Sequence, residues 1–143
     1  GYYFDFLNML KYYKRSQTPA TPAISLIQAL NAQMDAILEE GLENRWARHI
    51  EMAEIVRTWA RRHWALFPDE RFLSNTVTTI ENTRGVSIAD LNKELGKRGA
   101  MISNGYGSKL REKTFRIAHM GDLTPDDIHW VLSLIDDILD LTQ

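Results

Sequence analysis

The sequence predicts an α/β protein in which a long connecting helix leads into a small α/β sandwich, whose sheet of about three strands is covered on one side by helices. Three observations predict this fold class. A long apolar stripe at helical spacing comes first, short segments with the composition of strands follow, and an amphipathic helix lies at the end. The predicted order is helix, strand, helix, strand, strand, helix.

The long helix is predicted from Pro22 to about Trp64. Thr21 suits its N-cap because the hydroxyl can accept a hydrogen bond from a backbone N–H, and Pro22 suits the first helical position, where no N–H is needed. Gly41 interrupts the apolar stripe, but a related stripe continues beyond it, so we expect one long helix, straight or bent. The first stripe consists of Ile24, Ile27, Leu30, Met34, Ile37 and Leu38.

The later elements are predicted from local composition. β-branched residues and alternation indicate strands, whereas Ser87 and Thr124 are suitable N-caps for two further helices. The loop at Asn104–Lys113 is rich in turn-forming and basic residues, and its Gly-Tyr-Gly sequence is more typical of a turn than of a ligand contact. The predicted strands are Ser74–Asn82, Met101–Ser103 and Thr114–Met120, and the shorter helices begin at Ser87 and Pro125.

Composition limits the classes of function. The chain has 143 residues, 44% of them hydrophobic and 25% charged, which is typical of one soluble globular domain. A net charge of -2 argues against bulk attraction to nucleic acid or to an anionic membrane. Because there is no cysteine and the four histidines have no ligand spacing, we expect no metal site, and a cytoplasmic location is compatible with the composition.

The first residues suggest that the chain is part of something longer. Aromatic side chains are dense from Tyr2 to Tyr13, and the sequence does not begin with methionine. No apolar stretch is long enough to span a bilayer, and the start lacks the ordered regions of a signal peptide. We therefore expect a fragment of a longer protein.

Arg116 is the first candidate for a functional role. In the predicted strand TFRIAHM it alternates with Phe115 and Ile117, so it points to the opposite face of the sheet. A guanidinium that leaves water must be paired, and its fork geometry matches a carboxylate. On these residues alone, an arginine at a solvated sheet edge or in a structural salt bridge is the commoner outcome.

The segment QTPATP, ahead of the long helix, is the second candidate. Helix capping accounts for Thr21 and Pro22 but leaves Gln17 and Thr18 without a role. A helix N-terminus carries free N–H groups and a partial positive charge, so a polar cluster there also suits a phosphate group. Composition does not decide between capping and phosphate binding.

The sequence resembles the C-terminal part of class V aminotransferases, which are pyridoxal-phosphate enzymes that include the alanine–glyoxylate and serine–pyruvate aminotransferases. Three blocks in matching order carry the resemblance along nearly the whole chain: the Thr-Pro pairs before the helix, the run EEGLENRWARH and the strand FRIAHMG. The soluble hydrogenase small subunit type shares these motifs.

The resemblance implies roles for particular residues. Arg116 falls on the strand arginine that holds the substrate α-carboxylate in this family. The segment before the long helix corresponds to one that reaches the cofactor phosphate of the neighbouring subunit in a homodimer, and Gln17, Thr18 and Thr21 are its candidate contacts for pyridoxal 5'-phosphate. No lysine of this chain lies in the family's Schiff-base motif, so the resemblance implies no catalytic residue here and an inactive isolated chain.

The resemblance also implies a domain organisation and a reaction. Residues 1–21 would be the tail of a large cofactor domain, residues 22–66 the connecting helix, and residues 67–143 the small C-terminal domain. The reaction would transfer an amino group between a small amino acid, such as alanine or serine, and a 2-oxo acid, such as glyoxylate or pyruvate. The alternative is a free-standing ligand-binding or interaction domain without catalysis.

Overall fold

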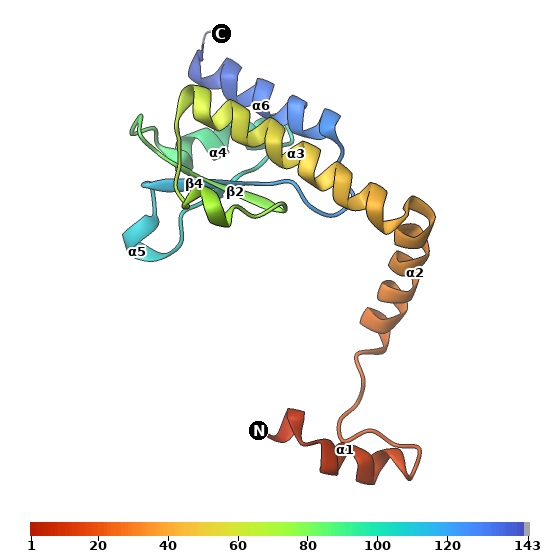
Figure 1. Cartoon of the computed structure of the whole chain (residues 1–143). Coiled ribbons are helices and arrows are strands. Elements are labelled where there is room, and N and C mark those ends of the chain that lie inside the picture. The colour runs from red at the N-terminus through yellow and green to blue at the C-terminus, as the bar shows by residue number, and fades with distance from the viewer. Residues whose placement is uncertain (142–143) are drawn as a thin grey trace. The chain divides into compact units, whose positions relative to one another are not determined.

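The computed structural model describes residues 1–141 and divides the chain into two compact units, 1–42 and the residues from Glu43 onward. Figure 1 shows the elements of both units. The first unit contains the 3-10 helix η1 (Tyr2–Phe4) and the helices α1 (Phe6–Tyr13) and α2 (Ile24–Glu40).

The second unit is an α/β sandwich. Its helices are α3 (Leu42–His63, whose first residue closes the first unit), α4 (Ile88–Lys97), α5 (Gly107–Leu110) and α6 (Pro125–Leu139), with a 3-10 helix η2 at Glu70–Phe72. Its strands are β1 (Ala65–Leu66), β2 (Val77–Glu81), β3 (Ser103–Asn104) and β4 (Thr114–Ala118). They form one antiparallel sheet in the order β1-β2-β4-β3, and α3, α4 and α6 lie over one side of it (Figure 1).

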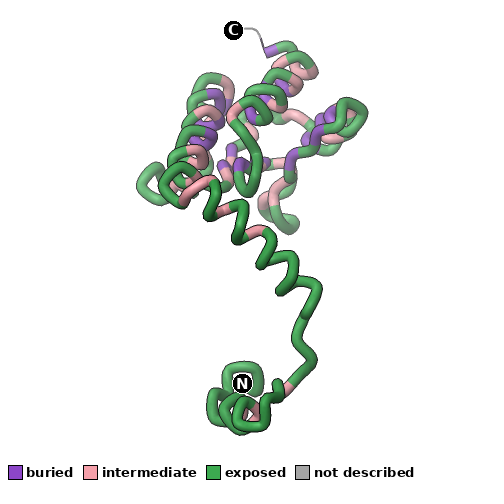
Figure 2. Tube along the Cα trace, turned by 90° about the vertical axis from the view of Figure 1, so that its right-hand side faces the viewer, coloured by how far each residue is buried: buried purple, intermediate pink, exposed green. Residues whose placement is uncertain are grey.

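The hydrophobic core lies between this sheet and the three long helices. Apolar side chains of α3, α4 and α6 pack against the inward-facing residues of β2 and β4. The rings of Trp64 and Phe115 pack edge to face, with their centroids 5.1 Å apart. Buried residues are therefore confined to the second unit, whereas residues 1–42 are exposed or half-buried throughout (Figure 2). The fold class predicted from the sequence is confirmed.

The predicted start of the long helix is wrong. The helix begins at Ile24 with Ala23 at its N-cap, and no side chain caps it. Ala23 has φ -76° and ψ 73°, and the N–H of Ile24 donates to the carbonyl of Pro22 at 2.9 Å. These are the marks of an inverse γ-turn, which keeps Pro22 out of the helix and leaves Thr21 too far from its first N–H groups to cap them.

The long helix is also two helices, and the sheet has one more strand than expected. At Gly41 the backbone has φ 84° and ψ 139°, which ends α2 and separates it from α3. The missed strand is β1, which pairs with Ile80 and Glu81 of β2. Two residues are too few to show an alternating pattern, so only the tertiary pairing reveals this strand. The second expected strand is found at Ser103–Asn104 instead of Met101–Ser103.

Candidate functional site

Arg116 lies at the centre of β4, between two other strands. It is paired with Thr79 of β2 on one side and with Ser103 of β3 on the other. Phe115 and Ile117 face the core and are fully or almost fully buried, whereas Arg116 is half-buried on the opposite face. The predicted alternation along this strand is confirmed, and Arg116 is not at a sheet edge.

The guanidinium of Arg116 has few partners. Its Nη2 donates to the backbone carbonyl of Asn104 at 3.3 Å, and the ring centroid of Tyr106 lies 4.1 Å from its Cζ. Its Nε is buried without a hydrogen-bond partner, and no carboxylate among residues 1–141 forms an ion pair with it. A guanidinium that is partly desolvated and has spare N–H donors is suited to bind an anion.

The loop before β4 delivers both contacts to Arg116. The side-chain Oδ1 of Asn104 accepts from the N–H groups of Gly105 and Glu112 at 2.8 and 2.9 Å, and its Nδ2 donates to the Glu112 carboxylate at 2.5 Å. The other Glu112 oxygen accepts from the N–H of Ile88, and Asn82 donates to the Glu112 carbonyl. The sequence predicted only a turn here, but the structure is a loop that is cross-linked by polar side chains.

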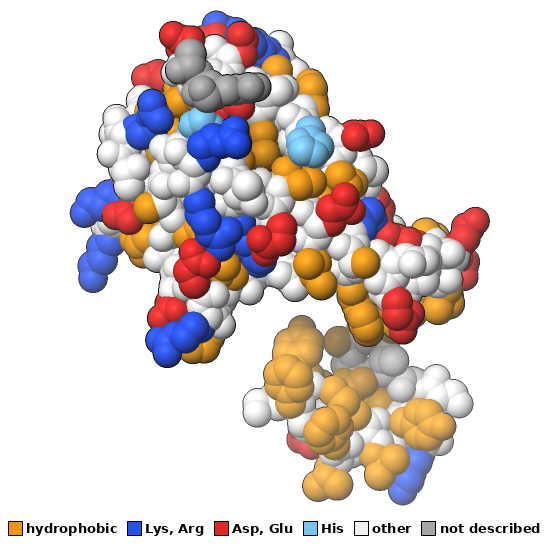
Figure 3. All heavy atoms as spheres, turned by 45° about the horizontal axis from the view of Figure 1, so that its top comes forward, with side chains coloured by type: hydrophobic (Ala, Val, Ile, Leu, Met, Phe, Trp, Pro, Cys, Tyr) orange, Lys and Arg blue, Asp and Glu red, His pale blue; other side chains and the backbone are white. Residues whose placement is uncertain are grey.

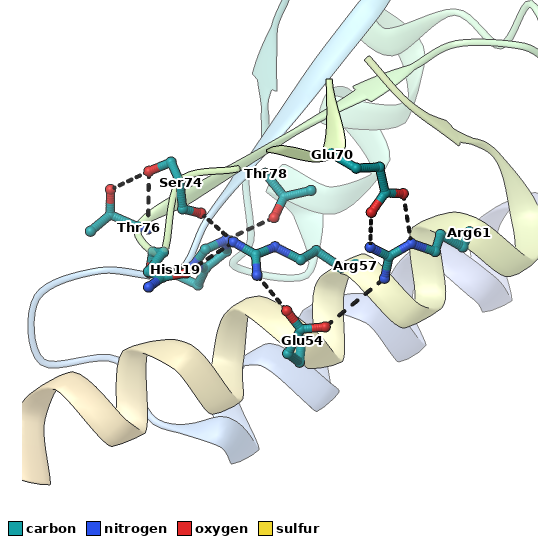
Figure 4. Close-up of polar contacts among 9 residues, drawn as sticks. Glu54, Arg57, Arg61, Glu70, Ser74, Thr76, Thr78 and His119 are labelled. Carbon is teal, nitrogen blue, oxygen red and sulfur yellow. Dashed lines mark hydrogen bonds and ion pairs between the residues drawn. The ribbon is translucent and has the colours of Figure 1, made fainter. Parts of the chain in front are cut away.

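A second polar network holds the far end of β4 (Figure 4). The Nδ1–H of the fully buried His119 donates to the Asn75 carbonyl at 3.2 Å, and its Nε2 accepts from the Thr78 hydroxyl at 2.9 Å. Both contacts suit a neutral ring, and burial lowers the pKa of His119, which is further lowered by the positive charge of Arg57. This histidine is therefore a structural group in the described fold.

Arg57 of α3 connects the same network to the helix layer. It is buried, forms an ion pair with Glu54, and donates to the Ser74 carbonyl and to the Asn75 side chain at 2.9 and 3.0 Å. One turn later, Arg61 binds Glu70 through two N–H groups (Figure 4). Sequence reasoning missed Arg57 because an arginine on a helix is usually solvated, and its partners lie 17 and 18 residues away.

In the first unit, the predicted phosphate contacts lie in part around one hollow. After α1 the chain reverses at Ser16, which has φ 52°, and the N–H of Gln17 donates back to the Tyr12 carbonyl at 3.1 Å. This is the hydrogen-bond pattern of a Schellman helix end. It places Gln17 and Thr18 on a hollow of about 650 Å³ whose lining is completed by Tyr13, Lys14 and Ser16. Thr21 is exposed and does not line this hollow.

A larger groove is lined by residues of α3 and α6. It has a volume of about 720 Å³, and none of the residues singled out above for substrate or phosphate binding lines it. Charges of both signs are distributed over the face of the molecule shown in Figure 3. Within the described residues, no group of histidine and acidic side chains could hold a metal ion, and no helix is long and apolar enough to cross a membrane.

Several known proteins have sequences similar to this chain. No protein-family model matches the chain. An uncharacterised aminotransferase from Methanocaldococcus jannaschii is 38% identical over 123 residues, which is 85% of this chain and 32% of that protein. A serine–glyoxylate aminotransferase from Arabidopsis thaliana is 34% identical over 142 residues, which is 96% of this chain and 35% of that protein.

A solved structure agrees with these relatives. The aspartate aminotransferase of subgroup IV from Thermus thermophilus superposes with a TM-score of 0.80 at 26% identity, covering 100% of this chain and 40% of that one. The chain thus spans about a third of the length of the curated relatives it matches. In sequence and in fold, it corresponds to the C-terminal region of the class V pyridoxal-phosphate-dependent aminotransferases.

Proposed function

We propose that this chain is the substrate-anchoring C-terminal region of a pyridoxal-phosphate-dependent aminotransferase, with Arg116 as the residue that binds the substrate α-carboxylate. One observation carries the proposal: the guanidinium of Arg116 is partly desolvated, its Nε is buried without a partner, and no described carboxylate neutralises it. A bound carboxylate would supply the missing charge and would accept from the guanidinium N–H groups that remain open to it.

The substrates we propose are a small amino acid, such as alanine or serine, and a 2-oxo acid, such as glyoxylate or pyruvate. The relatives' names support this class, since they include serine–glyoxylate and L-aspartate–glyoxylate aminotransferases. Both partners of such an exchange carry a carboxylate next to the reacting carbon. A single arginine can therefore anchor the amino acid in one half of the reaction and the oxo acid in the other.

The residues of the first unit fit the phosphate group of pyridoxal 5'-phosphate. Lys14 offers an ammonium group, Ser16 and Thr18 offer hydroxyl groups, and Gln17 offers an amide around the same hollow. We propose Gln17 and Thr18, with Thr21 beside them in the sequence, as phosphate contacts, made to the neighbouring subunit of a homodimer. When bound, the cofactor supplies the electron sink that amino-group transfer requires.

Arg116 contributes orientation to this chemistry. A carboxylate held in the plane of the guanidinium has a fixed direction, and the rest of the substrate is placed relative to β4. Because the same contact is made before and after the chemical step, its loss weakens binding of both substrates more than it slows the step itself. No lysine of this chain is assigned to the Schiff base, so we propose that the isolated chain does not transaminate.

We also propose a domain assignment within the whole enzyme. Residues 1–21 belong to the end of the large cofactor domain, residues 22–66 connect the domains, and residues 67–143 form the small C-terminal domain, in an enzyme of the cytoplasm. The connecting part contains the break at Gly41. The absence of buried residues in 1–42 supports packing of this segment against parts of the enzyme that lie outside the chain.

The proposed role of Arg116 is tested by two substitutions in the full-length enzyme. Arg116→Ala should raise the KM of both the amino acid and the oxo acid by about 10- to 150-fold, because this is the loss of affinity expected when a hydrogen bond between charged groups is removed. Arg116→Lys keeps the charge but not the fork, so we expect an intermediate KM. The cofactor's visible absorbance should be unchanged in both variants, and an unaltered KM in Arg116→Ala would contradict the proposal.

A further inference from the structure

We propose that Tyr106 is a positioning residue that holds the Arg116 guanidinium in the orientation in which it receives the carboxylate. This inference rests on the proposed function of Arg116. Tyr106 is 74% exposed, yet its ring centroid lies 4.1 Å from the Arg116 Cζ. A tyrosine that is mostly in water does little for the core, so its contact with the arginine is its main interaction in the described structure.

Two contacts from one loop restrain the guanidinium in different directions. The Arg116 Cζ lies over the ring of Tyr106, and the Asn104 carbonyl accepts from Nη2. A carboxylate binds in the plane of a guanidinium, so we place the Tyr106 ring against the face of the group, where it leaves that plane open. Nε is buried and Nη1 has no hydrogen-bond partner in the described chain, so the Nη1–Nη2 edge is the side we assign to the carboxylate.

The loop holds Tyr106 in place before any ligand arrives. The Asn104 and Glu112 side chains close the loop at its base, and Gly105 lies against the Leu110 carbonyl, where a side chain would not fit. The position of Tyr106 is therefore set by the backbone on both sides of it. A preformed support of this kind lowers the entropy that the long arginine side chain loses when it binds a ligand.

The aromatic face, not the hydroxyl group, should carry this effect. The ring attracts the cation through its π-system, whereas no hydrogen bond of the Tyr106 hydroxyl is found in residues 1–141. Tyr106→Phe should therefore retain the function, and Tyr106→Leu, which has similar apolar character without a ring, should lose it. These two variants differ in the feature under test and form a matched pair.

The test measures KM and kcat of the full-length enzyme for the amino acid and for the oxo acid. We expect Tyr106→Leu to raise both KM values about three- to tenfold with a smaller effect on kcat, and Tyr106→Phe to stay within about twofold of the wild type. Arg116→Ala is measured in parallel. If Arg116→Ala raises KM but Tyr106→Leu does not, the role of Tyr106 is refuted while that of Arg116 stands. If Arg116→Ala leaves KM unaltered, the proposed role of Arg116 is refuted.

A spectroscopic measurement separates positioning from a general loss of structure. In protein labelled with ¹⁵N-arginine, the Arg116 Nε–H signal should carry a ring-current shift that persists in Tyr106→Phe and disappears in Tyr106→Leu. Titration with pyruvate should move this signal less steeply in Tyr106→Leu than in the wild type. Equal shifts and equal titrations in the two variants would overturn the proposal, and Tyr106→Met replaces the leucine variant if the latter does not fold.

Discussion

Gly105 is a residue at which the loop beside Arg116 leaves no space for a side chain. A Cβ built on it would lie 2.0 Å from the Leu110 carbonyl oxygen and 2.5 Å from the Thr114 hydroxyl oxygen. We predict that Gly105→Ala lowers the free energy of unfolding by about 1–3 kcal/mol, because backbone atoms must move to admit the methyl group. Urea unfolding of the variant measures this loss.

Gly96 supplies the matched control for this substitution. It lies inside α4, and nothing is within 4 Å of a Cβ added to it. Gly96→Ala should therefore stabilise the protein slightly, by up to about 1 kcal/mol, since alanine is the better helix former. If both variants lost stability to the same extent, steric conflict in the loop would not be the cause.

His119 makes stability depend on pH. Burial holds the pKa of its ring below the ordinary value of 6.5 in the folded chain, so the unfolded chain binds a proton more readily. The contribution of the neutral ring is present above pH 6.5 and is lost as the pH falls through the lower pKa of the folded state. We predict that the wild type loses more stability between pH 7.5 and pH 5.5 than His119→Gln does, as measured by urea unfolding at each pH.

The carboxylates do not account for the same interval. The pKa values of Asp69, Glu70, Glu94 and Asp127 are lowered by their hydrogen-bond partners from ordinary values of 3.8 or 4.5, so their contributions are lost at more acidic pH. Identical pH dependence of the wild type and His119→Gln in the interval from 7.5 to 5.5 would show that His119 remains able to take up a proton in the folded chain.

Single residues were predictable where the pattern was local. Strand alternation placed Arg116 opposite the buried Phe115 and Ile117, and this is confirmed. The surroundings of Arg116 were not predictable, because Tyr106 meets it only through the conformation of the loop, which depends on hydrogen bonds to Asn82 and Ile88 in other segments. A one-dimensional pattern does not contain these contacts.

At the scale of secondary-structure elements, α6 begins with a complete capping box. The Thr124 hydroxyl oxygen accepts from the N–H of Asp127, and the Asp127 carboxylate accepts from the N–H of Thr124. We predict that Thr124→Ala lowers the free energy of unfolding by about 0.5–2 kcal/mol, because an orphan N–H of the helix loses its acceptor. Thermal or urea unfolding measures the loss.

A glycine at the same position is the control. Glycine tolerates the N-cap conformation, so Thr124→Gly should lower the free energy of unfolding by only about a few tenths of a kcal/mol. Ser87 caps α4 in the same way, by accepting from the N–H of Asp90. Because the two caps are on different helices and share no partner, the losses from Thr124→Ala and Ser87→Ala should add.

The elements that the sequence predicted well are those with a capping residue and a buried face. Ser87 and Thr124 cap α4 and α6 as expected. Thr21 does not cap α2, since the γ-turn at Ala23 lies between them. A γ-turn of this kind is compatible with many residue types, so the sequence does not indicate it. The strand β1 escaped prediction for a different reason, because its two residues gain strand structure only by pairing with β2.

At the scale of the whole molecule, burial is distributed unequally between the two units. From Glu43 onward the chain has a hydrophobic core, but residues 1–42 contain no buried residue (Figure 2). The apolar stripe of α2 is real, yet it is open to water, and Leu26 is 70% exposed. Periodicity predicted helical structure in this segment, although not its start at Ile24 or its break at Gly41, and it could not tell which surface the stripe packs against. In the first unit, strongly exposed apolar side chains include Tyr2, Tyr3, Phe4, Phe6, Leu7, Tyr13, Ile24, Leu26, Leu30 and Leu38.

This difference predicts how the 143-residue chain responds to protease. Helices of this length are marginal in water without tertiary packing, so α1 and α2 should open far more often than the elements of the second unit. Brief treatment with chymotrypsin should therefore cut within residues 1–42 and leave a resistant fragment that begins close to Glu43, as mass spectrometry would show. Equal resistance of both units would mean that the first unit is stabilised by burial that this structure does not contain. In the full-length enzyme the same sites should be protected, because the proposed assignment packs this segment against the rest of the protein.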